Sequence, residues 1–306
     1  MSANLRGMCV ILATPFDQQK RIDEGSLRSL ISFELNAGVH GITILGALGE
    51  VLRLSDAERQ QITRITLDEV KGRVPVVAGT GANGTDLAVM YSKQAEEQGV
   101  DALMVAPPRV TNPSDETLLK YYSDIAKEVS IPIVVQDEPM TYPVHMSPKL
   151  IARLSEIKNI EYVKLEDPPT PVKISQIRDL IDDRLAIFGG LGGLYALEEL
   201  LRGAVGMMTG FAYPEVLVKV YDAFSNGKTD TAREIFFKAL PLIRYEAQAP
   251  ISVAIRKEIF KKRGVIANSD LREPAAKLDQ RTLTELNELI SATGMNRFAS
   301  DKLSPK

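Results

Sequence analysis

The sequence predicts an α/β protein whose fold is a (β/α)8 barrel with additional C-terminal helices. Three observations favour this class. Short apolar runs recur at intervals of roughly 25–35 residues, segments of helical periodicity separate them, and the resulting strand–helix units number eight, which closes a parallel sheet into a barrel. An open doubly wound sheet is the main alternative. It usually carries a Gly-rich phosphate turn after its first strand, whereas here that strand ends in "TPFD".

Each predicted strand is a run of mostly apolar residues that ends near a Gly, a Pro or a polar residue, as buried parallel strands do. In chain order the runs are "CVILATPF" (9–16), "GITILG" (41–46), "VPVVAG" (74–79), "ALMVAP" (102–107), "PIVVQD" (132–137), "YVKLE" (162–166), "LAIFGG" (185–190) and "VGMMTG" (205–210).

The segments between the strands place apolar residues three and four positions apart, which is typical of an amphipathic helix. The segment 26–38 has such a face and ends in a glycine that can cap the helix. The segment 55–73 opens with Ser55 and has Glu58 three residues later, the spacing of a capping box. Further helical segments cover 86–99, 114–129 and 147–157.

Beyond the eighth unit the pattern predicts about three extra helices, in 229–246, 251–264 and 283–294. We assign residues 1–225 to the barrel and 226–306 to a helical appendage packed on it, within a single structural unit. We expect the appendage to cap the barrel or to supply contacts between subunits.

The composition excludes several classes of partner. Net charge is −3 and no basic tract occurs, so neither nucleic acid nor a membrane surface is an expected partner. No stretch approaches the ~18 consecutive apolar residues of a membrane span, the first residues lack a signal-peptide core, and the single Cys9 suits a reducing compartment. His40 and His145 lie far apart without metal-ligand spacing. We expect a cytoplasmic protein without a metal site, and no feature of the sequence calls for a cofactor.

One charged residue interrupts the sixth predicted strand. In "EYVKLEDPP" (161–169), Lys164 stands among apolar residues. Long cationic side chains often reach back to water from such places. However, active sites of these barrels lie at the carboxyl ends of the strands, and an amine in a dry pocket can attack a ketone in its neutral form to give a Schiff base. Both interpretations of Lys164 remain open on this evidence alone.

The order and spacing of several motifs resemble the dihydrodipicolinate synthase / N-acetylneuraminate lyase family over nearly the whole chain. The matching stretches are "LATPF" (12–16), "GALGE" (46–50), "VPVVAGTGANGT" (74–85), "YVKLE" (162–166) and "KEIFKKRGVIANSDLREP" (257–274). The resemblance implies a class I aldolase-type barrel that assembles as a tetramer or dimer, acts on a small 2-oxo acid, and uses Lys164 as its nucleophile.

The resemblance also implies a substrate-binding turn after the second strand, where "GALGE" stands for the family's Gly-Thr-Thr-Gly-Glu. Small residues in such a turn let backbone N–H groups approach a carboxylate closely. The residues of this predicted carboxylate site are Gly46, Ala47, Leu48, Gly49 and Glu50.

Four positions depart from the pattern of the family's synthases. Gln136 stands where they have the tyrosine of Tyr-Asn-x-Pro, and an amide does not titrate as a phenol does. Ala47 and Leu48 lack the hydroxyl groups of the threonine pair that relays protons. Thr141 aligns with the arginine that binds the second substrate. Together these changes disfavour dihydrodipicolinate synthase activity.

The "QDEP" segment is more similar to the sugar-acid branch of the family, such as 2-keto-3-deoxyarabonate dehydratase. We therefore interpret the protein as a Schiff-base lyase, a dehydratase or an aldolase of a 2-keto-3-deoxy sugar acid. Gln136 and Asp137 are the further catalytic candidates, with Asp137 or a water that it holds as the first choice of base and Glu138 as another. Candidates for contacts with the substrate are Tyr142, Gly189 and Thr209.

Two alternatives stay open. The first uses the same imine chemistry: a synthase-like or cyclic-imine deaminase activity on a pyruvate-type substrate. The second belongs to another class, a barrel that keeps the lysine but only binds a metabolite.

Overall fold

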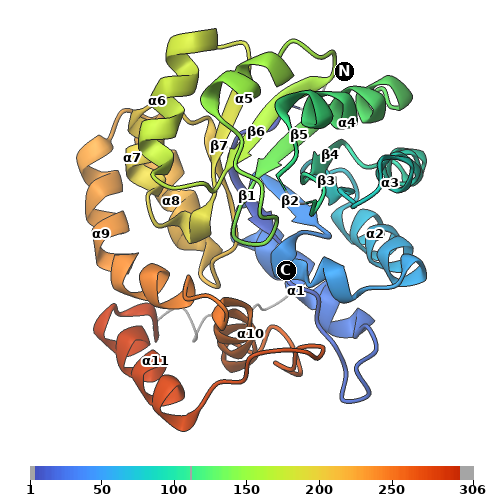
Figure 1. Cartoon of the computed structure of the whole chain (residues 1–306). Helices are drawn as coiled ribbons and strands as arrows, with labels where there is room; N and C mark the ends of the chain where they lie inside the picture. Colours follow the sequence, from blue (N-terminus) through green and yellow to red (C-terminus); the bar gives the residue numbers. More distant parts are fainter. Residues whose placement is uncertain (1–3, 111, 297–306) are drawn as a thin grey trace.

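The fold is a closed parallel barrel, seen in a computed structural model that describes residues 4–110 and 112–296 (Figure 1). Each strand overlaps one predicted apolar run, although the first and sixth strands begin two residues earlier than predicted. The strands pair in sequence order, and the last strand closes on the first. The strands are β1 (Gly7–Ile11), β2 (Gly41–Ile44), β3 (Val76–Gly79), β4 (Ala102–Val105), β5 (Ile133–Asp137), β6 (Ile160–Leu165), β7 (Ala186–Gly189) and β8 (Gly206–Thr209). The predicted barrel is confirmed.

Helices surround the barrel and alternate with its strands (Figure 1). The capping box predicted for the second helix is present, because Ser55 accepts from the N–H of Glu58 and the Glu58 carboxylate accepts from the N–H of Ser55. These helices are α1 (Glu24–Asn36), α2 (Asp56–Val70), α3 (Thr85–Gln98), α4 (Asp115–Glu128), α5 (Pro148–Leu154), α6 (Thr170–Ile181), α7 (Ala196–Leu201) and α8 (Pro214–Ser225). Short 3-10 turns follow β2 and β7: η1 (Ala47–Gly49), η2 (Val51–Arg53) and η3 (Leu191–Gly193).

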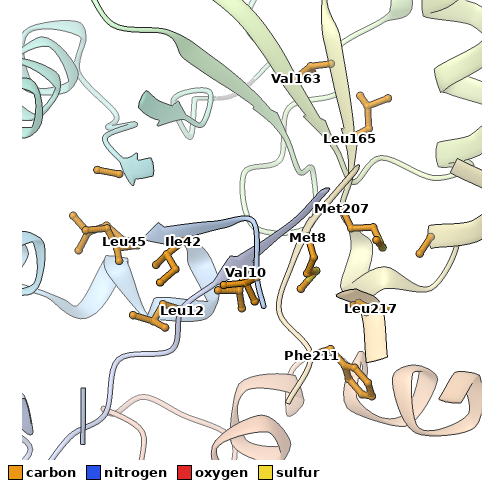
Figure 2. Packing of buried hydrophobic residues seen from close by; sticks show 14 of the residues in the cluster. Met8, Val10, Leu12, Ile42, Leu45, Val163, Leu165, Met207, Phe211 and Leu217 are labelled. Carbon is orange, nitrogen blue, oxygen red and sulfur yellow. The ribbon is translucent and has the colours of Figure 1, made fainter. Parts of the chain in front are cut away.

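The alternation of side chains along each strand divides the core into two parts. One set fills the barrel interior, including Cys9, Tyr162 and Phe188. The other set packs between the strands and the helices; Figure 2 labels several of its members, among them Val163 and Leu165. Because successive residues face opposite sides, Lys164 between these two points into the barrel.

The C-terminal segment adds the helices α9 (Thr229–Glu246), α10 (Ser252–Lys262) and α11 (Gln280–Ala292), drawn in orange to red beside the barrel in Figure 1. Ion pairs tie this segment to the barrel: Lys257 with Glu50, and Arg263 with Glu215. The three helices were predicted; the division at residues 225 and 226 stays a prediction, and residues 297–306 of the proposed appendage lie outside the described part. Within that part, none of the helices has both the length and the apolarity that a membrane crossing requires.

Candidate active site

A cavity of about 170 Å³ opens at the carboxyl ends of the strands. The lining residues that matter for the chemistry come from three places in the chain. Gln136, Glu138, Lys164 and Glu166 come from the ends of β5 and β6, Ala47 and Leu48 come from the turn after β2, and Ser252 and Arg256 come from α10. The C-terminal appendage therefore contributes directly to the wall of the candidate site.

Lys164 lies at the base of this site. Only 3% of the surface of this residue is exposed, so its side chain does not reach back to bulk solvent. The Nζ atom lies 2.7 Å from Oε2 of Glu166, which follows two positions later and so faces the same side. Gly190 leaves the space for that carboxylate, because a Cβ atom there would lie 2.3 Å from Cγ of Glu166. The lysine and its acidic partner are thus placed together by local strand geometry.

Two further side chains complete the polar group around Lys164. Nε2 of Gln136 donates to Oε2 of Glu166 at 3.2 Å. Glu138, two positions after Gln136, is buried, and its carboxylate accepts from the N–H of Thr141 at 3.0 Å. Burial, followed by the negative charge of Glu166, raises the pKa of Glu138. A carboxylate bound to the lysine and a second carboxyl group that tends to keep its proton therefore share one site.

Asp137, the predicted base, lies elsewhere. It follows Gln136 on β5 and so faces the helical layer, where its Oδ2 atom accepts from Nζ of Lys173 at 2.5 Å. It does not line the cavity. Burial raises the pKa of Asp137 to about 6, against the opposing effect of Lys173. The alternation of strand residues that brings Gln136 into the site takes its neighbour out of it.

In the turn after β2, too, some of the predicted residues line the cavity and others do not. Ala47 and Leu48 line the cavity, and Gly46 lies against the side chains of Ile11 and Met104 inside the barrel mouth. Thr14 holds the turn by donating to the carbonyl oxygen of Gly49 at 2.7 Å.

Glu50, the last residue of the turn, points away from the cavity. Its carboxylate binds Nζ of Lys257 at 2.5 Å and accepts from the N–H of Arg272 at 3.0 Å. It fastens the appendage to the barrel and is not among the residues that line the cavity.

The remaining predicted contacts are also outside the cavity lining. Tyr142 is buried, its ring centroid is 5.8 Å from the guanidinium of Arg109, and burial raises its pKa to about 12. Gly189 faces Glu199, because a Cβ atom there would lie 1.8 Å from the Glu199 carboxylate. Thr209 is buried at the end of β8, with its methyl group facing Gly193.

Three polar residues of the site were missed by sequence reasoning: Glu166, Ser252 and Arg256. The sequence could have identified Glu166, because it stands two residues after Lys164 and strand alternation gives both side chains the same direction. No such indication existed for Ser252 and Arg256, since both lie on α10, a distant helix whose packing no local pattern predicts. Within residues 4–110 and 112–296, no group of three or more His, Cys, Asp or Glu side chains could hold a metal ion.

Comparison with known proteins identifies the family. Residues 4–293 match the family model described as Dihydrodipicolinate synthetase family. The chain is 36% identical to a 4-hydroxy-tetrahydrodipicolinate synthase of Methanospirillum hungatei, covering 93% of this chain and 98% of that protein. It is 29% identical to an L-2-keto-3-deoxyarabonate dehydratase of Azospirillum brasilense, covering 92% of each. Among solved structures, a dihydrodipicolinate synthase from Rhodopseudomonas palustris matches with a TM-score of 0.89 and 32% identity, covering 95% of this chain and 99% of that one.

The chain therefore belongs to the dihydrodipicolinate synthetase family, and the predicted resemblance is confirmed. Membership makes it an enzyme of the class I, Schiff-base-forming lyases, which sets aside the interpretation as a barrel that only binds a metabolite. The named relatives include both synthases and a dehydratase, so the family alone does not select the reaction.

Proposed function

We propose that this enzyme is a dehydratase of a 2-keto-3-deoxy sugar acid, with Lys164 as the residue that forms the Schiff base. One observation carries the proposal: the carboxylate of Glu166 lies 2.7 Å from Lys164 Nζ, with the amide of Gln136 beside it. Among the described residues that line the cavity there is no tyrosine. A carboxylate next to the imine position suits removal of a proton from the neighbouring carbon, which is the first requirement of dehydration.

The reaction begins with the attack of the neutral Lys164 amine on C2 of the 2-oxo acid. Glu166 is placed to take up the proton that the ammonium releases, and loss of water from the carbinolamine gives the iminium. The iminium withdraws electrons from C3, whose proton then passes to a base and leaves an enamine. Glu166 takes the place of Asp137 as the proposed base, because a base must reach the proton that it removes, and Asp137 is bound to Lys173 on the other side of the sheet.

The second half of the reaction expels the hydroxyl group at C4. The enamine electrons form the C3–C4 double bond as the C4–O bond breaks, and Glu138 supplies the proton that makes the leaving group water. Its raised pKa supports this role, because a general acid must hold its proton until the bond breaks. Rearrangement of the unsaturated iminium and hydrolysis release the 2-oxo semialdehyde from a terminal-alcohol substrate and regenerate the Lys164 amine.

The C1 carboxylate of the substrate is proposed to bind at the turn of Ala47 and Leu48. The first N–H groups of a helical turn have no partner within that turn, and η1 begins at Ala47 beside the cavity. The absence of hydroxyl groups here removes the proton relay of the synthases but keeps this backbone site.

Gly46 and Gly49 would shape that turn. Glu50, Tyr142, Gly189 and Thr209 would act from outside the cavity by holding its walls, in place of the direct contacts that the sequence suggested.

The direct test is turnover by the purified enzyme. 2-Keto-3-deoxy pentonates should lose water to give a 2-oxo semialdehyde, measured by coupled oxidation of the aldehyde and by NMR. The hexonates carry a secondary alcohol at C5 and should give a 2,5-dioxo acid, measured by NMR. Condensation of pyruvate with aspartate semialdehyde should be undetectable under the same conditions. The synthase alternative is favoured by the name of the 36% identical relative, and efficient condensation would establish it and overturn the dehydratase. Aldol cleavage to pyruvate and an aldehyde would place the enzyme among the aldolases instead.

A further inference from the structure

Lys173 joins the ends of two strands behind the candidate site. It lies in the first turn of α6, and only 7% of its surface is exposed. Its Nζ atom donates to Oδ2 of Asp137, the last residue of β5, at 2.5 Å. The same atom donates to Oδ2 of Asp167, just beyond the end of β6, at 2.9 Å. These two contacts, which we call the Lys173 bridge, pair a buried ammonium with a carboxylate from each strand.

Each carboxylate of the bridge is next in the chain to residues that line the cavity. Asp167 directly follows Glu166. Asp137 stands between Gln136 and Glu138. Because neighbouring residues of an extended chain face opposite sides, the bridge holds from the helical side the same backbone that presents these side chains to the cavity. The bridging lysine itself lies outside the cavity lining.

The bridge bears most directly on Glu166, which lies just past the end of its strand. β6 ends at Leu165, and the N–H of Glu166 donates to the carbonyl oxygen of Asp137 at 2.8 Å. The chain then leaves the sheet and enters α6 at Thr170. The Lys173 bridge ties this departing segment to β5, and so it restricts how far the Glu166 backbone can move relative to the lysine that forms the imine.

We propose that Lys173 is a positioning residue for proton transfer at C3 of the imine. In this step the C3–H bond breaks, the proton passes to the Glu166 carboxylate, and the electron pair forms the C2–C3 double bond of the enamine as the iminium nitrogen becomes neutral. The inference rests on the role proposed for Glu166 and adds a residue that acts through it. A base must lie within hydrogen-bond reach of the proton, and a misplacement of about 1 Å can slow a reaction roughly 10²-fold.

Pyruvate allows imine formation and proton transfer to be measured separately. Sodium cyanoborohydride traps the imine at Lys164, and intact mass gives the pyruvate concentration for half-maximal labelling. Exchange of the pyruvate methyl hydrogens in D2O, followed by NMR at saturating pyruvate and corrected for the rate without enzyme, reports proton transfer through the enamine. Glu166→Gln should slow this exchange by roughly 10²–10⁴ and sets the scale for the other variants.

Two variants break the bridge to different extents. Lys173→Met removes both contacts, and exchange should fall by roughly 10–100-fold. Asp167→Ala removes only the contact beside Glu166 and leaves the buried pair of Lys173 with Asp137 in place. This variant should fold, and its exchange should fall by at least about threefold. In both variants the pyruvate concentration for half-maximal labelling should stay within about twofold of the wild-type value, because Lys164 and the cavity are unchanged.

Asp167→Asn and His145→Gln are the matched controls. Asp167→Asn keeps an oxygen that can accept from Lys173, so its exchange should stay within about twofold of the wild-type rate. His145 is the other partner of Asp167, since its Nδ1 lies 3.2 Å from Oδ1 of that residue. His145→Gln should leave exchange unchanged, so that a loss in Asp167→Ala is traced to the contact with Lys173.

The outcomes separate this inference from the proposed function. Exchange at the wild-type rate in Asp167→Ala overturns the positioning role, even if Lys173→Met does not fold. An equal loss of labelling and exchange overturns it as well, because it shows a general loss of structure, and so does a loss in His145→Gln as large as that in Asp167→Ala. Normal exchange by Glu166→Gln overturns the choice of base, and a wild-type enzyme that pyruvate does not label at Lys164 overturns the proposed function itself.

Discussion

Two buried lysines, Lys164 and Lys257, look alike in burial and pairing but differ in their surroundings. Lys257 is 0% exposed, its Nζ lies 2.5 Å from the Glu50 carboxylate, and that nitrogen also donates to the carbonyl oxygen of Asp270. The Phe16 ring covers it, with its centroid 4.4 Å from the ammonium. Lys164 is 3% exposed and 2.7 Å from Glu166, yet it stands against the cavity.

Burial and an acidic partner do not by themselves make a lysine reactive. Burial lowers the pKa of Lys257 against the opposing charge of Glu50, but no carbonyl compound can reach an amine that is closed in on every side. Lys164 has a partner that can take its proton, and it lines a cavity in which a ketone can bind. The first lysine joins the appendage to the barrel, and the second is available for chemistry.

The largest expected effect comes from removing the lysine at the cavity. Lys164→Ala should abolish turnover and abolish labelling by pyruvate and cyanoborohydride, because no other amine lines the cavity among the described residues. The fold should change little, since Glu166 keeps the Gln136 amide as a partner and, unlike the fully buried Glu50, is exposed to the cavity, with 12% of its side chain accessible. Peptide mapping of the labelled wild-type enzyme should place the adduct on a peptide that contains Lys164. An adduct on any other lysine would contradict the assignment.

Replacing the acidic partner should have the next largest effect. Glu166→Gln keeps the volume of the side chain and removes the base, so kcat should fall by roughly 10²–10⁴, the usual range for general acid–base help. Labelling of Lys164 should persist at saturating pyruvate.

Asp137→Asn is the matched control for Glu166→Gln, because it makes the same change from a carboxylate to an amide on the adjacent strand. Because Asp137 binds Lys173 outside the cavity, its effect on kcat should stay below about threefold. A larger loss with Asp137→Asn than with Glu166→Gln would return the role of base to Asp137.

The lysine that joins the appendage should give the opposite pattern. Among the described residues, Lys257→Met leaves the buried Glu50 with Arg53 and the N–H of Arg272 as the remaining partners of its side chain. Removing one member of a buried ion pair costs about 3–5 kcal/mol. Because Glu50 keeps these donors, we expect the free energy of unfolding, measured with denaturant, to fall by about 3 kcal/mol. Labelling of Lys164 in the folded protein should be retained. An unchanged stability, or folded protein that cannot be labelled, would remove the distinction between the two lysines.

Much of the fold could be predicted from the sequence because its determinants are local. A run such as "GITILG" reports a strand by its own apolar character, and Ser55 with Glu58 reports a helix start by spacing alone. Strand alternation also gives the direction of Lys164, and it could have given Glu166 and the outward direction of Asp137 if it had been applied to each neighbour.

The rest of the site depends on contacts between distant segments. Glu50 was assigned to the substrate through its motif, but its partner Lys257 is more than 200 residues away in the chain. Arg256 enters the cavity only because the appendage packs where it does. The assembly into dimers or tetramers has the same character and stays a prediction, and one related structure is described as a monomeric dihydrodipicolinate synthase variant. Light scattering would measure it.

A further expected effect concerns Glu199, a buried acid for which no cationic partner is found among the described residues. Thr170 donates to its Oε1, while Oε2 has no partner in that same part of the chain. Burial raises its pKa to about 8, so the folded protein binds a proton there that the unfolded chain, with a pKa near 4.3, has already released. The folded state therefore binds more protons between these values, and its free energy of unfolding should decrease as pH rises from about 5 to about 8, then level off. Glu199→Gln removes this titration. The melting temperature of the variant minus that of the wild type should therefore be larger at pH 8 than at pH 5. Equal differences at both pH values would mean that Glu199 is charged in the folded enzyme.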